Sequence, residues 1–210
     1  MIIVWDFNGT ILDDVDLCID IENKMMRDHG YGQVTRDRYL EIFRFPVSDY
    51  YLDLGVDFND YSYEQISIDF HKDYRARRQE AKIMDDFHDT IRKAKRLGYG
   101  NVILSASRED ILIEQCEELG IREEFDELLG INDLYASSKV GRGLAFKAAH
   151  PDRMVMLGDS VHDFEVAKEL GIDCWLIARG HQSKRKLLEV TDQVVDSLSE
   201  LPMEQWEDKQ

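Results

Sequence analysis

The sequence has few cysteines, few prolines and no long apolar run. Its cysteines, Cys18, Cys116 and Cys174, are odd in number and far apart, which indicates neither a disulfide framework nor a zinc site. Only 3 prolines occur in 210 residues, and 43% of the residues are hydrophobic, so a globular chain is expected. No apolar run approaches the roughly 20 residues that span a bilayer. No basic region precedes the first apolar residues, so no signal peptide is predicted either.

Positive charge is also scarce. The chain has 26 lysines and arginines against 43 aspartates and glutamates, which gives a formal net charge of −17. This charge argues against nucleic acid and anionic membrane surfaces as partners, because basic side chains neutralise phosphate backbones. A small phosphorylated ligand stays compatible with this charge, since one local cluster of positive charge can hold it. These features predict a soluble protein of the reducing cytoplasm.

The first fourteen residues, M-I-I-V-W-D-F-N-G-T-I-L-D-D, organise the rest of the chain. The apolar run from Ile2 to Trp5 predicts a strand buried on both faces of a parallel sheet. The run stops at Asp6, and Gly9 allows the backbone to turn sharply. Because open α/β sheets bind ligands beyond the carboxyl ends of their strands, Asp6 is a candidate site residue. An aspartate near a glycine is also ordinary turn chemistry.

A long helical segment follows this strand. Helical apolar spacing begins at Val15 and continues through several short, aromatic-rich helices with no strand pattern. An ordinary crossover between strands is much shorter. We therefore predict that residues 15–82 form an inserted helical domain with an aromatic core, which divides an α/β core into residues 1–14 and 83–210. Three arginines near its end are expected on a solvated helix face: Arg75, Arg77 and Arg78.

Strands and helices alternate after the inserted segment. Further strands are predicted at Val102 to Leu104, Leu128 to Ile131, Met154 to Leu157, Cys174 to Ile177 and Val194–Val195. The first of these is expected to end at Ser105, and Ser107 with Asp110 resembles a capping box for the next helix. The alternation predicts an α/β fold with a doubly wound parallel sheet.

Polar residues follow four of the predicted strands. They are Asp6, Ser105, Lys139 in a polar loop before a short helix, and the pair Asp159 and Asp163, the latter opening a helix. Since the carboxyl ends of parallel strands meet at one edge, these side chains are expected to converge. Three crowded carboxylates need a cation, and Mg²⁺ prefers oxygen ligands. Ser105 and Lys139 are suited to hold a phosphoryl group, and a carboxylate can form an aspartyl-phosphate.

These motifs resemble those of the haloacid dehalogenase superfamily over nearly the whole chain. They are D-x-N-G-T from Asp6, the strand-ending serine, the loop lysine and G-D-S-x-x-D from Gly158. The helical insert resembles that family's cap of the phosphoglycolate-phosphatase and β-phosphoglucomutase type. The resemblance implies a Mg²⁺-dependent phosphatase for a small phosphorylated metabolite, with a cap that closes over the site.

The resemblance also implies roles for individual residues. Asp6 would be the nucleophile, Ser105 and Lys139 the phosphate binders, and Asp159 with Asp163 the acids of a magnesium site. In the family this magnesium also takes a backbone carbonyl, which here belongs to Asn8. Four further residues are weaker candidates for substrate contact: Gly9, Thr10, Arg44 and Ala106. A packing role or a solvent-exposed charge suits Arg44 as well.

Asn8 departs from the family pattern. Phosphatases of this family usually carry an aspartate there as general acid and base, and losing such a group typically costs about 10²- to 10⁴-fold in rate. Several alternatives stay open: leaving groups that need little protonation, a substitute acid, slow turnover in a ligand-binding or sensing protein, and carbon–phosphorus cleavage. Candidate acids near in sequence are Asp13, Asp14 and His162, although Asp13 matches a usual hinge position. Carbon–phosphorus cleavage in that branch needs a cap lysine, and neither Lys24 nor Lys72 lies in a sequence context that favours this role.

Other classes of protein fit less well. A response-regulator receiver gathers similar groups, but its phosphorylated aspartate follows an earlier acidic pair, and it has no large insert. A serine hydrolase based on Ser105 would need a G-x-S-x-G elbow, which is absent. The histidines His150, His162 and His181 have no ligand spacing and are expected at the surface or in loops.

Overall fold

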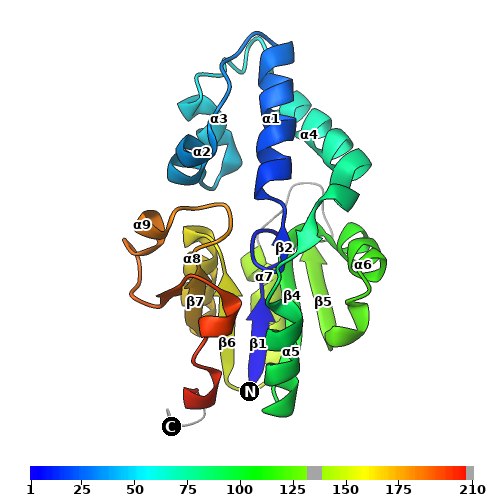
Figure 1. The fold of residues 1–210 in the computed structure, drawn as a ribbon, viewed down its shortest axis with the longest axis vertical. Helices are drawn as coiled ribbons and strands as arrows, with labels where there is room; N and C mark the ends of the chain where they lie inside the picture. Colours follow the sequence, from blue (N-terminus) through cyan, green and yellow to red (C-terminus); the bar gives the residue numbers. More distant parts are fainter. Residues whose placement is uncertain (132–138, 207–210) are drawn as a thin grey trace.

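The computed structural model describes residues 1–131 and 139–206, and it is built around a six-stranded sheet (Figure 1). The strand order is β5-β4-β1-β6-β7-β8, and every pairing between neighbours is parallel. The strands are β1 (Ile2–Trp5), β4 (Gly100–Arg108), β5 (Glu127–Ile131), β6 (Met154–Gly158), β7 (Asp173–Ile177) and β8 (Val194–Val195). The predicted α/β fold with a doubly wound parallel sheet is confirmed.

Helices cover both faces of this sheet. They are α5 (Phe87–Arg96), α6 (Glu109–Glu118), α7 (Lys139–Ala149), α8 (Val161–Leu170) and the short α9 (Lys184–Leu187). Ile3 and Trp5 of β1 share one apolar core with Phe87 of α5, whereas Val4 shares the other with Phe146 of α7. The alternation shows that β1 is buried on both faces, as its unbroken apolar run predicts. Among the described helices, none is long and apolar enough to cross a membrane.

Four helices lie beyond the carboxyl ends of the strands, at the top of Figure 1. They are α1 (Val15–Asp28), α2 (Arg36–Ile42), α3 (Val47–Asp53) and α4 (Tyr63–Arg77), and we call them the four-helix unit. Its interior is aromatic, because Tyr39, Tyr50 and Tyr51 are all buried and the rings of Tyr39 and Tyr50 meet edge to face at 5.6 Å. The predicted aromatic core is confirmed for these residues, while Phe45 and Tyr63 are exposed.

Two short strands, β2 (Leu12–Asp13) and β3 (Lys82–Ile83), pair antiparallel where the chain enters and leaves the four-helix unit. Two residues are too few to show an alternating pattern, so the sequence did not predict them. A 3₁₀ turn, Arg78–Glu80, precedes β3. Arg78 is buried there and binds Glu114 and Glu118 of α6 at 3.0 and 2.6 Å. The prediction of a solvated face was wrong for this arginine, because it links the four-helix unit to the sheet domain.

The predicted start of α6 was also wrong. Strand β4 continues past Ser105 to Arg108, with a register irregularity after Leu104, and α6 begins at Glu109 without a side-chain cap. Ser107 does not cap the helix, because its hydroxyl donates to Asn8 Oδ1 at 3.4 Å. Asp110 binds Arg108 instead. A hydrogen bond to distant Asn8 and an ion pair with neighbouring Arg108 thus take the place of the predicted capping box.

A pH effect is expected in the four-helix unit, where Glu22 of α1 is 3% exposed and accepts a hydrogen bond from Tyr50 at 2.5 Å. Burial raises the pKa of Glu22 to about 7, against hydrogen bonds from Tyr50 and Tyr51 that lower it. In the unfolded chain the carboxyl has its ordinary pKa near 4.5 and ionises more easily than in the folded protein. The free energy of unfolding should therefore fall as the pH rises from about 4.5 towards 7. Glu22→Gln keeps an acceptor for Tyr50 and should be more stable than the wild type at pH 8, by up to about 3 kcal/mol.

Urea unfolding at pH 4 and pH 8 tests this expectation. The advantage of Glu22→Gln should vanish at pH 4, where the wild-type carboxyl is protonated. Glu64→Gln, at an exposed position of α4, is the matched control and should change little at either pH. An advantage of equal size at both pH values would contradict the role of ionisation.

Candidate active site

The register of the sheet brings three predicted residues to one edge. Trp5 pairs with Ile103 of β4 and with Leu157 of β6, so Asp6, Ser105 and Asp159 all lie just beyond these levels. All three are buried. Carboxylate oxygens of Asp6, Asp159 and Asp163 lie within 4.8 Å of one another. The structure thus assembles the predicted acidic group, with Ser105 on the neighbouring strand.

Asp163 is held by the first turn of α8. Ser160 caps this helix, and the two residues form a capping box. Asp163 Oδ2 accepts hydrogen bonds from the backbone N–H of Asp159 at 3.2 Å and from the Ser160 hydroxyl at 2.7 Å. Gly158 makes this approach possible, since a Cβ there would lie 2.3 Å from that of Asp163. The helix begins at Val161, earlier than the predicted start at Asp163.

Lys139 supplies the positive charge of the site. It is the first residue of α7 and not a loop residue, while the serines predicted before it lie outside the described residues. Its Nζ donates to Asp6 Oδ1 and to Asp163 Oδ1, each at 2.5 Å. Burial lowers the pKa of Lys139, but the two carboxylates outweigh burial and raise it. The lysine is therefore charged.

One lysine does not balance three carboxylates. Burial raises the pKa of Asp6 to about 8, and the charges of Asp163 and Asp159 add to this despite Lys139. Burial likewise raises the pKa of Asp159 to about 7. The site has too little positive charge to balance its three carboxylates, and its potential ligands are carboxylate oxygens, so the residues suit a hard divalent cation. The described part of the chain thus holds an acidic group able to bind a metal ion; the backbone carbonyl of Asn8 stays a predicted ligand.

Removing the buried cation should destabilise the protein. Lys139→Met would leave Asp6 and Asp163 without their shared partner, at a cost of about 3–5 kcal/mol. Urea unfolding at neutral pH without divalent ions measures this cost, and adding Mg²⁺ should reduce it by restoring positive charge. Lys184→Met is the control, because Lys184 pairs with Asp196 at the surface and should contribute about 1 kcal/mol or less. Equal losses in the two variants would contradict the assignment of Lys139 as the charge balance.

The side chain of Asn8 is fixed by three partners. Its Nδ2 donates to Asp14 Oδ2 at 2.7 Å and to the Tyr74 hydroxyl at 3.0 Å, and its Oδ1 accepts from Ser107. A carboxylate only accepts hydrogen bonds, so the amide nitrogen must face Asp14. The amide oxygen is therefore turned towards β4.

Asp14 is the centre of a buried network that no local pattern in the sequence indicates. It is 1% exposed and accepts hydrogen bonds from the Gly9 N–H at 3.1 Å, the Tyr74 hydroxyl at 2.8 Å and His181 Nε2 at 3.2 Å. The other ring nitrogen of His181 meets the Tyr39 hydroxyl at 2.8 Å. The network joins α2 and α4 of the four-helix unit to loops of the sheet domain.

His181 lies in a loop, as predicted, but it is buried and not at the surface. Its backbone N–H donates to Asp159 Oδ2 at 2.5 Å. Burial lowers the pKa of its ring, but the Asp14 carboxylate outweighs burial and raises the pKa to about 9. Burial also acts to raise the pKa of Asp14, yet the charge and hydrogen bond of His181 lower it. The pair is a buried ion pair, and its members are 167 residues apart, so no local spacing indicates it.

Of the candidate substitute acids, Asp14 is the one that contacts Asn8. Asp13 is exposed in β2, and the ring of His162 stacks on Phe45 at 4.6 Å. The lowered pKa of Asp14 keeps it ionised, which makes it an acceptor and not a proton donor. Lys24, a lysine considered for carbon–phosphorus cleavage, is half-exposed and pairs with Asp73 at 2.7 Å.

The weaker substrate candidates have different surroundings. Gly9 has a φ of +76°, and a Cβ there would lie 2.3 Å from Asp159 Oδ2, so the turn requires glycine. Thr10 is fully buried, and its hydroxyl has no hydrogen-bond partner among the described residues. Ala106 is exposed. Arg44 is half-exposed and pairs with Asp53 at 3.0 Å. Their contacts with substrate stay predictions.

Fold and site together define an α/β protein with a carboxylate–lysine site at the carboxyl edge of a parallel sheet. The chain belongs to the haloacid dehalogenase-like hydrolase family, whose protein-family model matches residues 3–177. A comparison with curated proteins found no match.

Solved structures share the whole fold. A haloacid dehalogenase-like hydrolase, SP0104 from Streptococcus pneumoniae, is 19% identical with a TM-score of 0.78, and the match covers 94% of each chain. A predicted phosphatase from Clostridium acetobutylicum is 17% identical with a TM-score of 0.79, covering 98% of this chain and 97% of its own. A predicted phosphoglycolate phosphatase from Haemophilus somnus 129pt is 15% identical with a TM-score of 0.75, covering 94% of each chain. At these identities the likeness establishes the fold.

Proposed function

We propose that this protein is a Mg²⁺-dependent phosphatase that hydrolyses a small phosphorylated metabolite through an aspartyl-phosphate on Asp6. The observation that carries the proposal is the group of three buried carboxylates within 4.8 Å, with Lys139 bound to two of them. The predicted phosphatases that share the fold support the same class. We further propose that the protein acts in the cytoplasm, without a nucleic acid or membrane as partner, as its net charge of −17 favours.

Each residue of the site has its own role in the proposed reaction. Mg²⁺, held by Asp6, Asp159, Asp163 and the carbonyl of Asn8, would neutralise charge on the phosphoryl group when bound. Lys139 orients the Asp6 carboxylate through Oδ1, and its charge together with that of a bound Mg²⁺ would offset the burial that raises the pKa of Asp6 and so favour the ionised form. The other oxygen of Asp6 then attacks phosphorus while the ester oxygen leaves. Water then cleaves the acyl phosphate, which returns Asp6 and releases phosphate. Ser105 and Lys139 donate hydrogen bonds to the phosphoryl oxygens.

Asn8 narrows the range of substrates. Its amide nitrogen donates to Asp14 and Tyr74, and it has no titratable proton for the departing oxygen. Asp14, behind it, is an ionised acceptor. The enzyme should therefore favour phosphates whose leaving group needs little protonation, such as acyl and aryl phosphates, over alkyl esters.

The four-helix unit is proposed to act as a cap. It is joined to the sheet domain by β2 and β3, and its Tyr39 and Tyr74 reach His181 and Asp14 beside the site. Closure of such a unit would exclude water and select the substrate.

Phosphate release from a panel of acyl, aryl and alkyl phosphates, with and without Mg²⁺, tests the function. Acyl and aryl phosphates should turn over at least about 10²-fold faster than alkyl esters, which is the low end of what a missing acid costs. Chelation of Mg²⁺ should abolish release from every substrate. If no member of the panel released phosphate, the protein would bind phosphorylated ligands without hydrolysing them, and the proposal would fall.

A further inference from the structure

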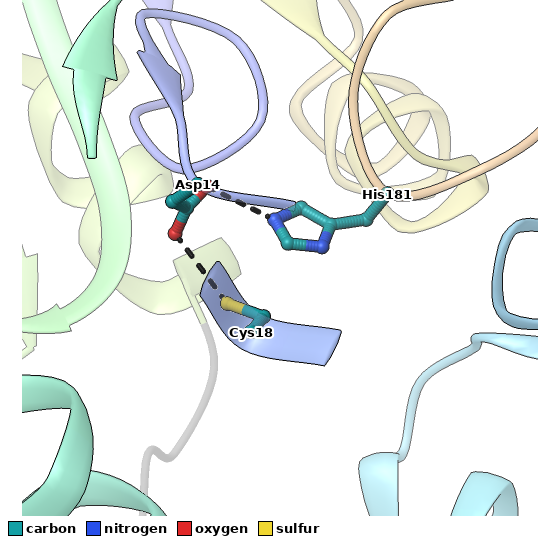
Figure 2. A group of neighbouring side chains, drawn as sticks. All are labelled: Asp14, Cys18 and His181. Atoms are coloured by element: carbon teal, nitrogen blue, oxygen red, sulfur yellow. Dashed lines mark hydrogen bonds and ion pairs between the residues drawn. The ribbon is translucent and has the colours of Figure 1, made fainter. Parts of the chain in front are cut away.

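Three side chains of a different character meet next to the acidic group (Figure 2). Asp14 precedes α1, Cys18 lies in the first turns of α1, and His181 comes from the loop between β7 and α9. All three are buried, and their potential ligand atoms lie within 4.8 Å of one another. Cys18 follows Asp14, the N-cap residue of α1, by four residues, which places the two side chains on the same side of the first turn. Figure 2 shows the thiol and the imidazole directed at the same carboxylate.

Two of the distances between these atoms are close to the ligand separations around a tetrahedral zinc ion. Cys18 Sγ lies 3.7 Å from Asp14 Oδ2, and His181 Nε2 lies 3.2 Å from Asp14 Oδ1. Bond lengths of about 2.3 Å to sulfur and about 2.0–2.1 Å to nitrogen and oxygen imply ligand separations of about 3.6 Å and about 3.4 Å. The two contacts use different oxygens of Asp14, so a zinc ion would be bound by both carboxylate oxygens or after the carboxylate has turned.

The surrounding contacts are those that accompany metal ligands. The Tyr39 hydroxyl faces His181 Nδ1 at 2.8 Å, so Nδ1 can carry the ring proton and leave the lone pair of Nε2 for a metal. The Asp14 carboxylate is oriented by the Gly9 N–H and the Tyr74 hydroxyl. Ligating histidines and carboxylates in proteins are usually fixed by partners of this kind.

The chemistry of the donors selects the metal. The acidic group of Asp6, Asp159 and Asp163 offers only oxygen and suits Mg²⁺. Thiolate and imidazole favour a softer ion such as zinc, which also accepts a carboxylate oxygen as ligand. A hydrogen bond alone explains why His181 lies beside Asp14. It does not explain the position of the Cys18 thiol in the same way, because a thiol is only a weak hydrogen-bond donor.

We propose that Asp14, Cys18 and His181 bind a Zn²⁺ ion, separately from the magnesium site. Binding would release two protons, one from the Cys18 thiol and one from between His181 and Asp14. The ion would link the start of α1 to the loop that contains His181. Three protein ligands leave a fourth position for water. The cysteine spacing had indicated no zinc site, because two of the ligands are not cysteines and one is distant in sequence.

Cobalt(II) is the probe, since it takes the same ligands and reports a thiolate by a charge-transfer absorption in the near ultraviolet. The full chain is freed of metal by chelation, and Mg²⁺ is kept in excess to occupy the carboxylate site. The wild type should bind one Co²⁺ per chain with this absorption, and Cys18→Ser should lack it. Cys116→Ser and Cys174→Ser remove equally buried free cysteines and should keep it. Tyr39→Phe should keep the absorption but weaken binding about 10- to 100-fold.

The absence of the absorption in wild type at one equivalent, or its persistence in Cys18→Ser, would overturn the proposal. A second measurement covers the case in which Cys18→Ser does not fold. In mild urea, Zn²⁺ should slow alkylation of wild-type Cys18 at least about tenfold, as expected for a thiolate bound to metal. Alkylation of Cys116 and Cys174 should slow much less. Equal slowing of all three, or none, would also overturn the site.

Discussion

Replacing Asp6 by asparagine is expected to lower phosphate release by at least about 10⁴-fold, because removal of the nucleophile abolishes the covalent route on which turnover depends. The reason is chemical, because a neutral amide oxygen is a poor nucleophile and forms no stable phosphoryl intermediate. Size and shape barely change, and an amide oxygen can still accept the hydrogen bond that Lys139 gives Asp6 Oδ1. The variant should therefore remain folded.

The measurement combines turnover with detection of the intermediate. Wild-type protein that has been quenched in acid during turnover should carry one phosphoryl group on Asp6, and Asp6→Asn should carry none. Asp192→Asn, an identical change at an exposed position, should keep wild-type turnover and phosphorylation. If Asp6→Asn retained a substantial rate, water would attack the substrate directly and the aspartyl-phosphate would be ruled out.

The parts of the site that the sequence predicted share one property. Asp6 and Asp159 each follow an unbroken apolar run, and the geometry of a parallel sheet then determines where they meet. Asp163 follows from the same logic, because Ser160 and Asp163 form a local capping box. A residue whose position depends on its own strand or helix is thus predictable from short-range pattern.

The parts that were missed depend on contacts between distant segments. His181 lies in a loop with no periodicity. It is buried because its ring makes hydrogen bonds with Asp14 and Tyr39, which are more than a hundred residues away in the sequence. Arg78 has the composition of a solvated helix face, but two glutamates of α6 draw it inward. Charged and polar pairs of this kind leave no trace in local spacing, so only the three-dimensional structure shows them.

Asn8→Asp is the second change with a large expected effect. It restores the aspartate that is usual in this family, and it also places a second carboxyl group beside Asp14. The new carboxyl would face Asp14, because Asn8 Nδ2 and Asp14 Oδ2 are 2.7 Å apart and Asp14 is buried. Two carboxyl groups at this distance hold one proton between them, which raises the pKa of the pair. The pair thus provides the missing proton donor. Hydrolysis of alkyl phosphates should rise about 10²- to 10⁴-fold.

The same repulsion should cost stability. Asn8→Asp removes a donor to Asp14 and adds a like charge, so the variant should unfold at lower urea concentration as the pH rises and the shared proton is lost. The double variant Asn8→Asp with Asp14→Asn reverses the direction of the hydrogen bond and keeps the total charge. It should recover stability at high pH, while Asp14→Asn alone controls for the loss of the His181 ion pair.

A comparison of substrates with different leaving groups distinguishes the effect of the added proton donor in Asn8→Asp from other effects of the substitution. Protonation matters most for alkyl phosphates, whose oxygen is a strong base, and least for acyl and aryl phosphates. Asn8→Asp should therefore raise kcat/KM strongly for alkyl substrates and little for the others, so that the preference of the wild type disappears. Equal changes across the three classes would show that Asn8 limits a different step. In that case the amide, held by Asp14 and Tyr74, would act by positioning groups and not by the proton it lacks.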